Sequence, residues 1–219
     1  MSNSILLLQE KLEKFVPPQT ASVLADWIVE ENVKIKITRI RRSKTGDYRP
    51  PQNGHGHRIT LNCDLNKYEF LVTLIHEFAH LKTTKRYSPK ELKLGEVMPH
   101  GKEWKHEFKS LMNQFIYSGI FPPEVNEALI GYMQNPAASS CSDLPLQRAF
   151  RKYDSGEKII IHLEDLSSGA VFKIRDGRTF RILKKMRKHF RCEELITKRI
   201  FSVNAIAEVE VIDQVTTTV

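Results

Sequence analysis

Three residues of the stretch 71–83, LVTLIHEFAHLKT, have types and spacing that could perform hydrolysis. His76 and His80 are four residues apart, so on a helix they lie on one face and can direct their imidazoles to a single Zn²⁺ ion. Glu77 lies about 100° round the helix from His76. From there it can reach a zinc-bound water without being a ligand. It can then act as general base and pass a proton to a leaving amine.

The pattern H-E-x-x-H also occurs by chance, because a histidine on a core helix is often simply hydrogen-bonded. The neighbouring residues favour the metal interpretation. Apolar residues surround the motif, at Leu71, Leu74, Ile75, Phe78 and Leu81. They predict a helix that is largely buried, where two histidines and a glutamate are costly unless they share a task or are fully paired.

A catalytic zinc site has three protein ligands and keeps one position open for water. Among the remaining histidines, His100 is the best candidate for the third ligand. It stands in PHGKEW, where Pro99 and Gly101 mark a turn and a helix begins. The alternative for His100 is a surface loop residue or a helix cap.

The two segments LVTLIHEFAHLKT and PHGKEWKHEFKSLM, joined by a polar loop, resemble the SprT-like metalloproteases, a group that includes bacterial SprT and eukaryotic Spartan. In that family the motif H-E-x-x-H is followed by H-G-x-x-[FW], whose histidine is the third zinc ligand. The resemblance implies zinc ligands at His76, His80 and His100, a general base at Glu77, and packing of the ligand loop by Trp104. It covers roughly residues 5–130 and implies a peptidase for proteins bound or crosslinked to DNA.

Two features depart from the family pattern. Lys82 occupies a position where many zinc proteases have a hydrophobic residue. Bacterial SprT-type proteins also continue into a four-cysteine zinc ribbon, whereas the C-terminal region of this chain has only Cys192. The segment FRCEEL can therefore be a relic of the ribbon in which apolar packing has replaced the metal.

The elements that must position the motif are helices and a short sheet. Apolar spacing and breakers predict helices at 4–15, 18–31, 67–86, 102–117 and 123–133, and strands at 33–43 and 57–63 separated by a loop at 49–56. We therefore expect an α+β fold with a zincin-like helical metalloprotease core and a short β-sheet, followed by a small all-β module.

The expected domain organisation is a metallopeptidase domain at 1–134, a linker at 135–156 and a basic β-rich domain at 157–219. The linker prediction rests on the small, polar and proline-bearing segment NPAASSCSDLP. The last domain is interpreted as either a degenerate zinc ribbon or a small barrel. Within it, AVFKIRDGRTFRI predicts a hairpin with a three-residue loop, Arg175–Gly177, which places Phe172 opposite Phe180 on an apolar face.

The positive charge of the chain belongs to one region. The formal net charge is +8, and residues 148–201 hold 15 Lys/Arg against 7 Asp/Glu, which accounts for all of it. A clustered positive field favours a polyanionic partner, DNA or another nucleic acid first, although a basic surface can also simply aid solubility. Phe172 and Phe180 are more consistent with a core than with base stacking. The candidates for phosphate contacts lie between strands, at Lys184, Lys185, Arg187 and Lys188.

The composition is that of a soluble globular protein, with 41% hydrophobic and 27% charged residues. No segment approaches the roughly 20 apolar residues of a membrane helix, and the apolar run 5–8 is too short for a signal peptide. The cysteines are odd in number and far apart, at Cys63, Cys141 and Cys192. They indicate neither a disulfide framework nor a metal knuckle, which favours the cytoplasm.

Three hypotheses of function follow. The first is a zinc-dependent metallopeptidase with Glu77 as general base. The second is a module that binds nucleic acid or a partner, with a structural zinc and no turnover, although a structural site has no need of Glu77. The third is zinc hydrolysis of a non-protein amide, since the attack of water is the same on any amide.

Overall fold

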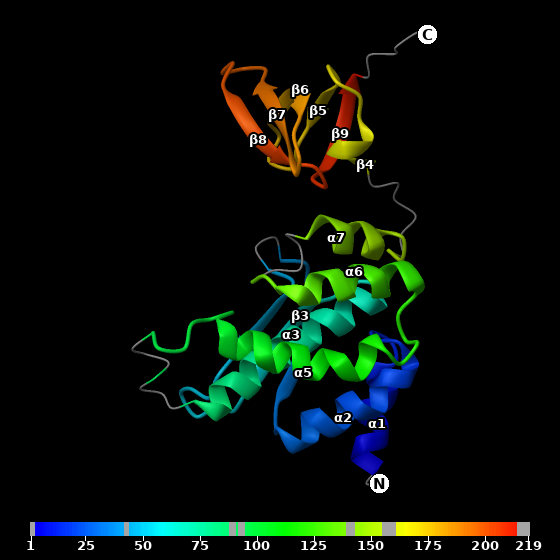
Figure 1. Ribbon diagram of the computed structural model, residues 1–219, viewed down its shortest axis with the longest axis vertical. Helices are drawn as coiled ribbons and strands as arrows, with labels where there is room; N and C mark the ends of the chain where they lie inside the picture. Colours follow the sequence, from blue (N-terminus) through cyan, green and yellow to red (C-terminus); the bar gives the residue numbers. More distant parts are fainter. Residues whose placement is uncertain are drawn as a thin grey trace. The chain divides into compact units, whose positions relative to one another are not determined.

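The computed structural model describes residues 3–41, 44–87, 91, 95–138, 143–154 and 161–213. These residues form a mixed α+β protein with six helices and two sheets (Figure 1). The chain divides into two compact units, Met1–Ser155 and Gly156–Val219, which are described separately. No helix of the described ranges is long and apolar enough to cross a membrane.

The helices of the first unit are α1 (Asn3–Leu12), α2 (Ala21–Glu30), α3 (Lys67–Arg86), α5 (Lys102–Ile116), α6 (Pro123–Gln134) and α7 (Leu144–Arg151), with a short 3₁₀ turn η1 (Pro18–Thr20) before α2. The start of α3 is fixed by Asn66, whose side-chain oxygen accepts hydrogen bonds from the main-chain N–H groups of Tyr68 and Glu69. The α5 helix begins after Gly101 and has no side-chain cap.

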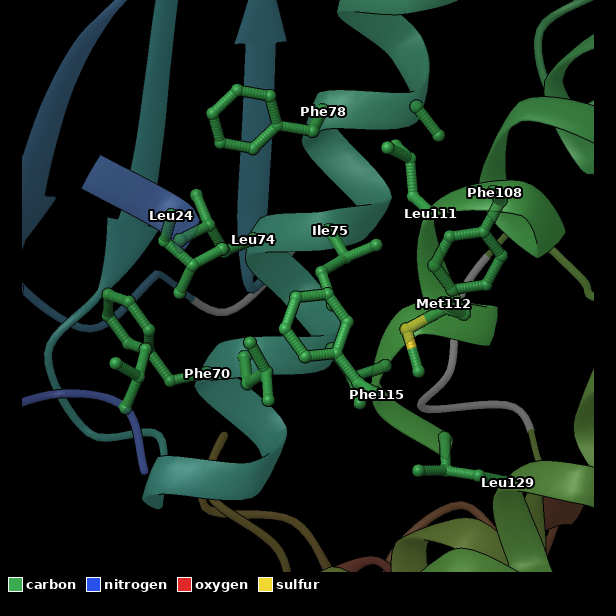
Figure 2. Packing of buried hydrophobic residues seen from close by; sticks show 14 of the residues in the cluster. Leu24, Phe70, Leu74, Ile75, Phe78, Phe108, Leu111, Met112, Phe115 and Leu129 are labelled. Atoms are coloured by element: carbon green, nitrogen blue, oxygen red, sulfur yellow. The ribbon is translucent and has the colours of Figure 1, made fainter. Parts of the chain in front are cut away.

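Helix α3 passes through the hydrophobic core, and apolar residues on several of its sides are buried. Figure 2 shows Ile75 of α3 beside Leu111 and Met112 of α5, while Leu74 lies beside Leu24 of α2. A helix that is apolar nearly all round is typical of a buried core element. Because α3 is packed against other elements on several sides, the positions of the histidines that it carries are well defined.

The sheet of the first unit has the strand order β1-β3-β2. Its strands are β1 (Lys34–Thr38), β2 (Gly46–Arg49) and β3 (Arg58–Asn62), with β1 parallel and β2 antiparallel to β3. The alternation predicted for the first strand is observed, because Lys34 and Lys36 are exposed and the isoleucines between and after them pack on the core. Strand β2 is an edge strand that the sequence did not predict.

The helix α7 corrects the prediction of a linker over 135–156. Asp143 caps this helix by accepting a hydrogen bond from the N–H of Leu146, and the side chains of Leu146 and Phe150 are buried in the core of the first unit. The amide of Asn66 donates to the main-chain oxygen of Phe150, which ties α7 to the start of α3. The predicted linker is therefore helical at 144–151, while 139–142, with Cys141, and 155–160 lie outside the described residues.

The second unit is all β, as predicted. Its strands are β4 (Ile161–His162), β5 (Val171–Lys173), β6 (Thr179–Lys185), β7 (His189–Glu194), β8 (Ile200–Asn204) and β9 (Glu208–Asp213), with a 3₁₀ turn η3 (Leu163–Asp165). They form one sheet in the order β4-β9-β5-β6-β7-β8, so β9 returns to pair with β5. Cys192 is buried in this sheet. Strand pairing in this unit is continuous from β4 to β8.

The predicted register of the first long hairpin is confirmed. Phe172 lies opposite Phe180, and their rings stack with centroids 5.7 Å apart in the interior of the unit. Ile174 and Arg178 close a three-residue loop in which Gly177 has a φ of 91°. A left-handed glycine at that position is what the bulged loop requires, so the phenylalanines form core and do not stack on bases.

Candidate metal centre

Three imidazoles converge in the first unit. His76 and His80 lie one turn apart on α3, and His100 comes from the turn that precedes α5. Their Nε2 atoms are separated by 3.1 Å for His76 and His100, 3.2 Å for His76 and His80, and 2.9 Å for His80 and His100. They are the one group of metal-ligating side chains in the described residues that is close enough to share an ion.

Hydrogen bonding cannot satisfy all three contacts. A neutral Nε2 atom either carries a proton and donates, or has a free lone pair and accepts. In any set of three such atoms at least two are in the same state, and that pair repels. A cation removes the conflict because it accepts all three lone pairs. Tetrahedral geometry with zinc–nitrogen bonds of about 2.05 Å requires nitrogens about 3.3 Å apart, close to the observed separations.

The electrostatics of the triad favour the neutral imidazoles that bind metal. Burial, with repulsion by the neighbouring histidines, lowers the pKa of His76 to about 2. Burial and the charge of His100 lower the pKa of His80 to about 4. Burial also lowers the pKa of His100. Each of these shifts favours the neutral imidazole, the form that metal coordination requires.

The third histidine is held in an uncommon conformation. His100 has a φ of 61°, in the left-handed region that few residues other than glycine adopt. The N–H of Gly101 donates to the oxygen of Met98, which closes the turn around His100. Backbone strain of this kind persists where the surrounding structure requires it, and it concentrates at functional sites.

Trp104 packs against all three imidazoles. Its ring centroid lies 4.6 Å from that of His76, 5.4 Å from that of His80 and 4.7 Å from that of His100. The side chain is fully buried, and its indole N–H donates to the main-chain oxygen of His76. The packing role that the family resemblance implies for Trp104 is therefore observed.

Glu77 is buried beside the triad with 6% of its surface exposed. Burial raises the pKa of its carboxyl to about 8; a hydrogen bond from the main chain of Tyr48 opposes this shift and the charge of Asp47 adds to it. The hydrogen bond from the main chain of Tyr48 thus orients the carboxyl group of Glu77 in the site. Glu77 does not belong to the group of potential metal ligands, so it would not be a fourth ligand of an ion held by the triad.

Gly46 of β2 makes room for that carboxylate. A β-carbon at position 46 would lie 2.5 Å from Oε1 of Glu77 and 2.8 Å from Cγ2 of Thr73. Such distances are far inside van der Waals contact, so a side chain there would displace Glu77. Gly46 and Tyr48 could not be predicted as site residues, because the segment GDYR at 46–49 is short and polar and lacks the apolar alternation of a strand.

The triad and Glu77 face a cavity of about 320 Å³. Its lining comes from β2 and the residues before it, from α3, and from single residues of the other elements: Lys44, Thr45, Gly46, Asp47, Tyr48, Val72, Thr73, His76, Glu77, His80, His100, Phe108 and Ala138. Tyr48 also hydrogen-bonds through its hydroxyl to Nδ1 of His57, at 2.8 Å, and the two rings stack. The Tyr48–His57 pair is a second feature of the site that the sequence analysis did not identify.

The departure at Lys82 has a structural explanation. Lys82 and Lys85 both form ion pairs with Glu31, whose side chain is 8% exposed. Burial of Glu31 disfavours its charge, but the hydrogen bonds and charges of the two lysines outweigh burial and lower the pKa of the carboxyl. Lys82, two residues after His80, therefore links α3 to the end of α2 through its ion pair with Glu31.

The predicted nucleic-acid residues all belong to the second unit and are exposed. Arg187 and Lys188 lie in the turn between β6 and β7, as predicted, but Lys184 and Lys185 are the last residues of β6 and not part of a connection. The strand continues through them because a bulge after Ile182 restores pairing with β7.

The first unit thus brings together three imidazoles that could hold a metal ion, the buried carboxyl group of Glu77 and an adjoining cavity. A comparison of the chain with family models, curated proteins and solved structures finds no match. Any function assigned to the protein therefore depends on these residues and their geometry.

Proposed function

We propose that the protein is a zinc-dependent metallopeptidase. The observation that carries the proposal is the triangle of three Nε2 atoms, 2.9–3.2 Å apart, with the buried carboxyl group of Glu77 beside it. His76, His80 and His100 would hold Zn²⁺, and Glu77 would not be a ligand. The ion would supply a Lewis acid that polarises a carbonyl and lowers the pKa of water.

Glu77 has the role of the proton carrier in this proposal. A Zn²⁺ ion held by the triad would favour the ionised form of Glu77 and so oppose the raised pKa that burial gives it. As a carboxylate, Glu77 would accept a proton from the attacking water as the oxygen forms a bond to the carbonyl carbon of the substrate. When the C–N bond breaks, Glu77 returns that proton to the amine nitrogen, so the carboxylate is regenerated. The N–H of Tyr48 holds the carboxylate in place, and Gly46 leaves it the necessary space.

The edge strand β2 supports a peptide as the substrate rather than another amide. Residues 45–48, which include most of β2, line the cavity, and within the described ranges β2 pairs with β3 on one side only. An unpaired strand edge can pair with the main chain of an extended peptide. A peptide held there would have its carbonyl groups beside the metal ligands and Glu77.

The substrates that we propose are proteins bound or crosslinked to DNA. This part of the proposal is supported by the concentration of the net charge of +8 in residues 148–201. A chain that is attracted to nucleic acid meets the proteins already bound there at a raised local concentration. Hydrolysis itself does not depend on this choice of substrate.

The experiment that tests the peptidase compares Glu77→Gln with the wild type on fluorescein-labelled casein, with and without a DNA duplex. We expect Glu77→Gln to retain one zinc per chain and to lose about 10²–10⁴-fold in kcat, the usual contribution of a general acid–base. Glu30→Gln, which changes an exposed carboxylate on α2 in the same way, should be fully active. His100→Ala should lower the zinc content, whereas the control His55→Ala should not.

The outcomes separate the three hypotheses. Full activity in Glu77→Gln would exclude Glu77 as the base. If the wild type binds zinc but cleaves neither casein nor a DNA-bound protein, the binding module with a structural zinc gains support. Cleavage of small acyl amides without cleavage of any protein would favour the non-protein amidase. Stoichiometric zinc in His100→Ala would remove His100 from the ligand set.

A further inference from the structure

The hairpin between β6 and β7 carries positive charge without compensation. Residues 184–191, KKMRKHFR, include no Asp or Glu. Their five Lys/Arg side chains are exposed, and we name them together the basic hairpin: Lys184, Lys185, Arg187, Lys188 and Arg191. None of the five forms an ion pair with a carboxylate in the described part of the chain.

The strand register brings two of these charges together. Lys184 lies directly opposite Arg191, and Arg191 lies opposite Ser202 on β8. Like charges at directly opposed positions of a sheet destabilise it. The nearest carboxylate in the ladder, that of Glu193, lies opposite Arg181, further from the turn. The fold thus tolerates a repulsive pair at this end of the sheet.

The other end of the same strand is different. At the hairpin between β5 and β6, all three cations have carboxylate partners: Lys173 pairs with Glu210 at 3.9 Å, Arg175 pairs with Glu208, and Arg178 pairs with Asp176 at 2.8 Å. The unit therefore has carboxylates available, and it pairs three of them with the cations of this hairpin. An external anion would supply at the basic hairpin what Glu210, Glu208 and Asp176 supply at the opposite end.

The basic hairpin offers no exposed aromatic ring. Residues 161–213 contain four phenylalanines and no Tyr or Trp. Phe172, Phe180 and Phe190 are buried, and Phe201 is half-buried beneath the guanidinium of Arg178. Single-stranded nucleic acid is bound in large part by stacking of bases on exposed aromatics. The surface is consequently suited to phosphates and not to bases.

We propose that the basic hairpin binds the phosphate backbone of nucleic-acid duplexes without regard to sequence. A duplex presents one charge per roughly 1.7 Å of its axis, about twice the density of one strand. A surface that reads only phosphates should therefore bind a duplex more tightly than a single strand of equal length. Leu183 and Met186 are exposed apolar side chains at the hairpin. An anionic membrane nevertheless fits less well, because the hairpin lacks the exposed aromatic rings that anchor interfacial surfaces.

This binding goes beyond the peptidase and does not depend on it. The residues of the basic hairpin belong to the second unit, whereas the triad and Glu77 belong to the first. A protein without turnover could bind duplexes, and an active peptidase could fail to bind them. An assay of peptidase activity and an assay of duplex binding can therefore each fail without affecting the other proposal.

The test measures fluorescence anisotropy of a fluorescein-labelled 20-base-pair duplex, and of its separate strands, with the full chain over a range of salt concentrations. Two variants each lower the net charge of the chain by three. The first is Lys184→Gln/Arg187→Gln/Lys188→Gln in the basic hairpin, and the second is Lys173→Gln/Arg175→Gln/Arg178→Gln at the opposite end of β6. We expect the first to weaken duplex binding at least about tenfold. The slope of log K against log salt should fall by about 0.9 for each phosphate that the variant no longer neutralises. The second variant should bind within about twofold of the wild type.

A single substitution provides a test that does not require the triple variant to fold. Arg191→Glu places a carboxylate opposite Lys184, so it should raise the melting temperature of the second unit while it weakens duplex binding. A merely structural role of Arg191 would change stability and binding in the same direction. Circular dichroism verifies that each variant retains its secondary structure.

Several results would overturn the proposal. Equal losses in both triple variants would show that net charge alone attracts the duplex. Tighter binding of a single strand would contradict a surface that reads only phosphates. Binding to vesicles of phosphatidylserine or to a polyglutamate peptide, but not to a duplex, would assign the basic hairpin to a membrane or to an acidic protein. No salt-dependent binding of any of these would leave it as a solubility surface.

Discussion

A glycine without space for a β-carbon gives the sharpest prediction at the level of single residues. Gly46→Ala places a methyl group where the carboxylate of Glu77 now lies, 2.5 Å from its Oε1 atom. We expect kcat on labelled casein to fall by about 10–100-fold, because a displacement of a catalytic group by about 1 Å has costs of that size. The zinc content should remain one per chain, since no metal ligand contacts position 46 in this way.

Gly131→Ala is the matched control, because nothing lies within 4 Å of a β-carbon at that position of α6. Alanine is favoured over glycine in a helix by about 1 kcal/mol, so this variant should keep full activity and melt slightly higher. Loss of zinc in Gly46→Ala, or an undiminished kcat, would contradict the positioning role of Gly46.

The convergence of His76, His80 and His100 could be predicted from the sequence, but the residues that position Glu77 beside them could not. The spacing of His76 and His80 follows from the helical period, and the turn around His100 follows from Pro99 and Gly101. The clearance at Gly46 arises between a strand and a helix that are distant in the chain. Its only local sign is a glycine in a polar segment, and such glycines usually mark loops.

At the level of elements, α7 is held to α3 by polar groups that include an acid in an unfavourable setting. Asn66, which caps α3, donates to the oxygen of Phe150 and to the carboxylate of Asp154. One turn further along, Glu69 accepts a long hydrogen bond from Gln147 of α7. Burial raises the pKa of Glu69 to about 7; the hydrogen bond opposes this shift, and the charges of Asp154 and Asp64 add to it.

This raised pKa predicts that stability falls as the pH rises. The folded protein holds the proton of Glu69 up to about pH 7, whereas the unfolded chain releases it near 4.5. Stability is therefore lost progressively between those values and stays low above them. Glu69→Gln should flatten this part of the profile and raise the melting temperature at pH 8, by about 2–4 °C for each kcal/mol relieved. Thermal melts from pH 4 to 8 measure it.

The control is Glu10→Gln, which alters an exposed carboxylate on α1 and should leave the pH profile unchanged. If the melting temperature of Glu69→Gln differed from that of the wild type by the same amount at every pH, the ionisation of Glu69 would not be the cause of the pH dependence.

The elements that can be predicted correctly have strong local signals. The register of the hairpin around Gly177 follows from the sequence, because only one loop length places Phe172 and Phe180 on the same face. Strand β2 and helix α7 escape prediction because tertiary contacts stabilise them. Residues 46–49 are polar and become a strand by pairing with β3. The helix α7 is short and lies in a polar segment, so its apolar face of Leu146 and Phe150 gives only a weak helical pattern in the sequence.

At the level of the whole molecule, the proposed catalytic and nucleic-acid surfaces belong to different units. Each residue that lines the cavity comes from positions 44–138, and α7 completes the core of the same unit. The sequence predicts a division of the chain into an α+β part and a basic β part. It does not show that the first part extends through α7 to residue 155.

A fragment of residues 1–155 should therefore retain the metal centre. We expect it to bind one zinc per chain, to hydrolyse casein with the kcat of the full chain, and to lose salt-dependent affinity for a duplex. A fragment of residues 1–134, which ends at the boundary predicted from the sequence, lacks the burial of Leu146 and Phe150 and should melt at a lower temperature. Equal stability of the two fragments would show that α7 contributes nothing to the first unit.

The packing of Trp104 on the three imidazoles gives the protein an intrinsic optical reporter. The chain has two tryptophans, and the other, Trp27, contacts Phe78 and Phe115 in the core and not the histidines. With Trp27 replaced by Phe, all tryptophan emission would come from an indole whose ring contacts each of the three clustered histidines. Occupancy of the centre could then be followed in real time and without a label, through the emission of Trp104 alone.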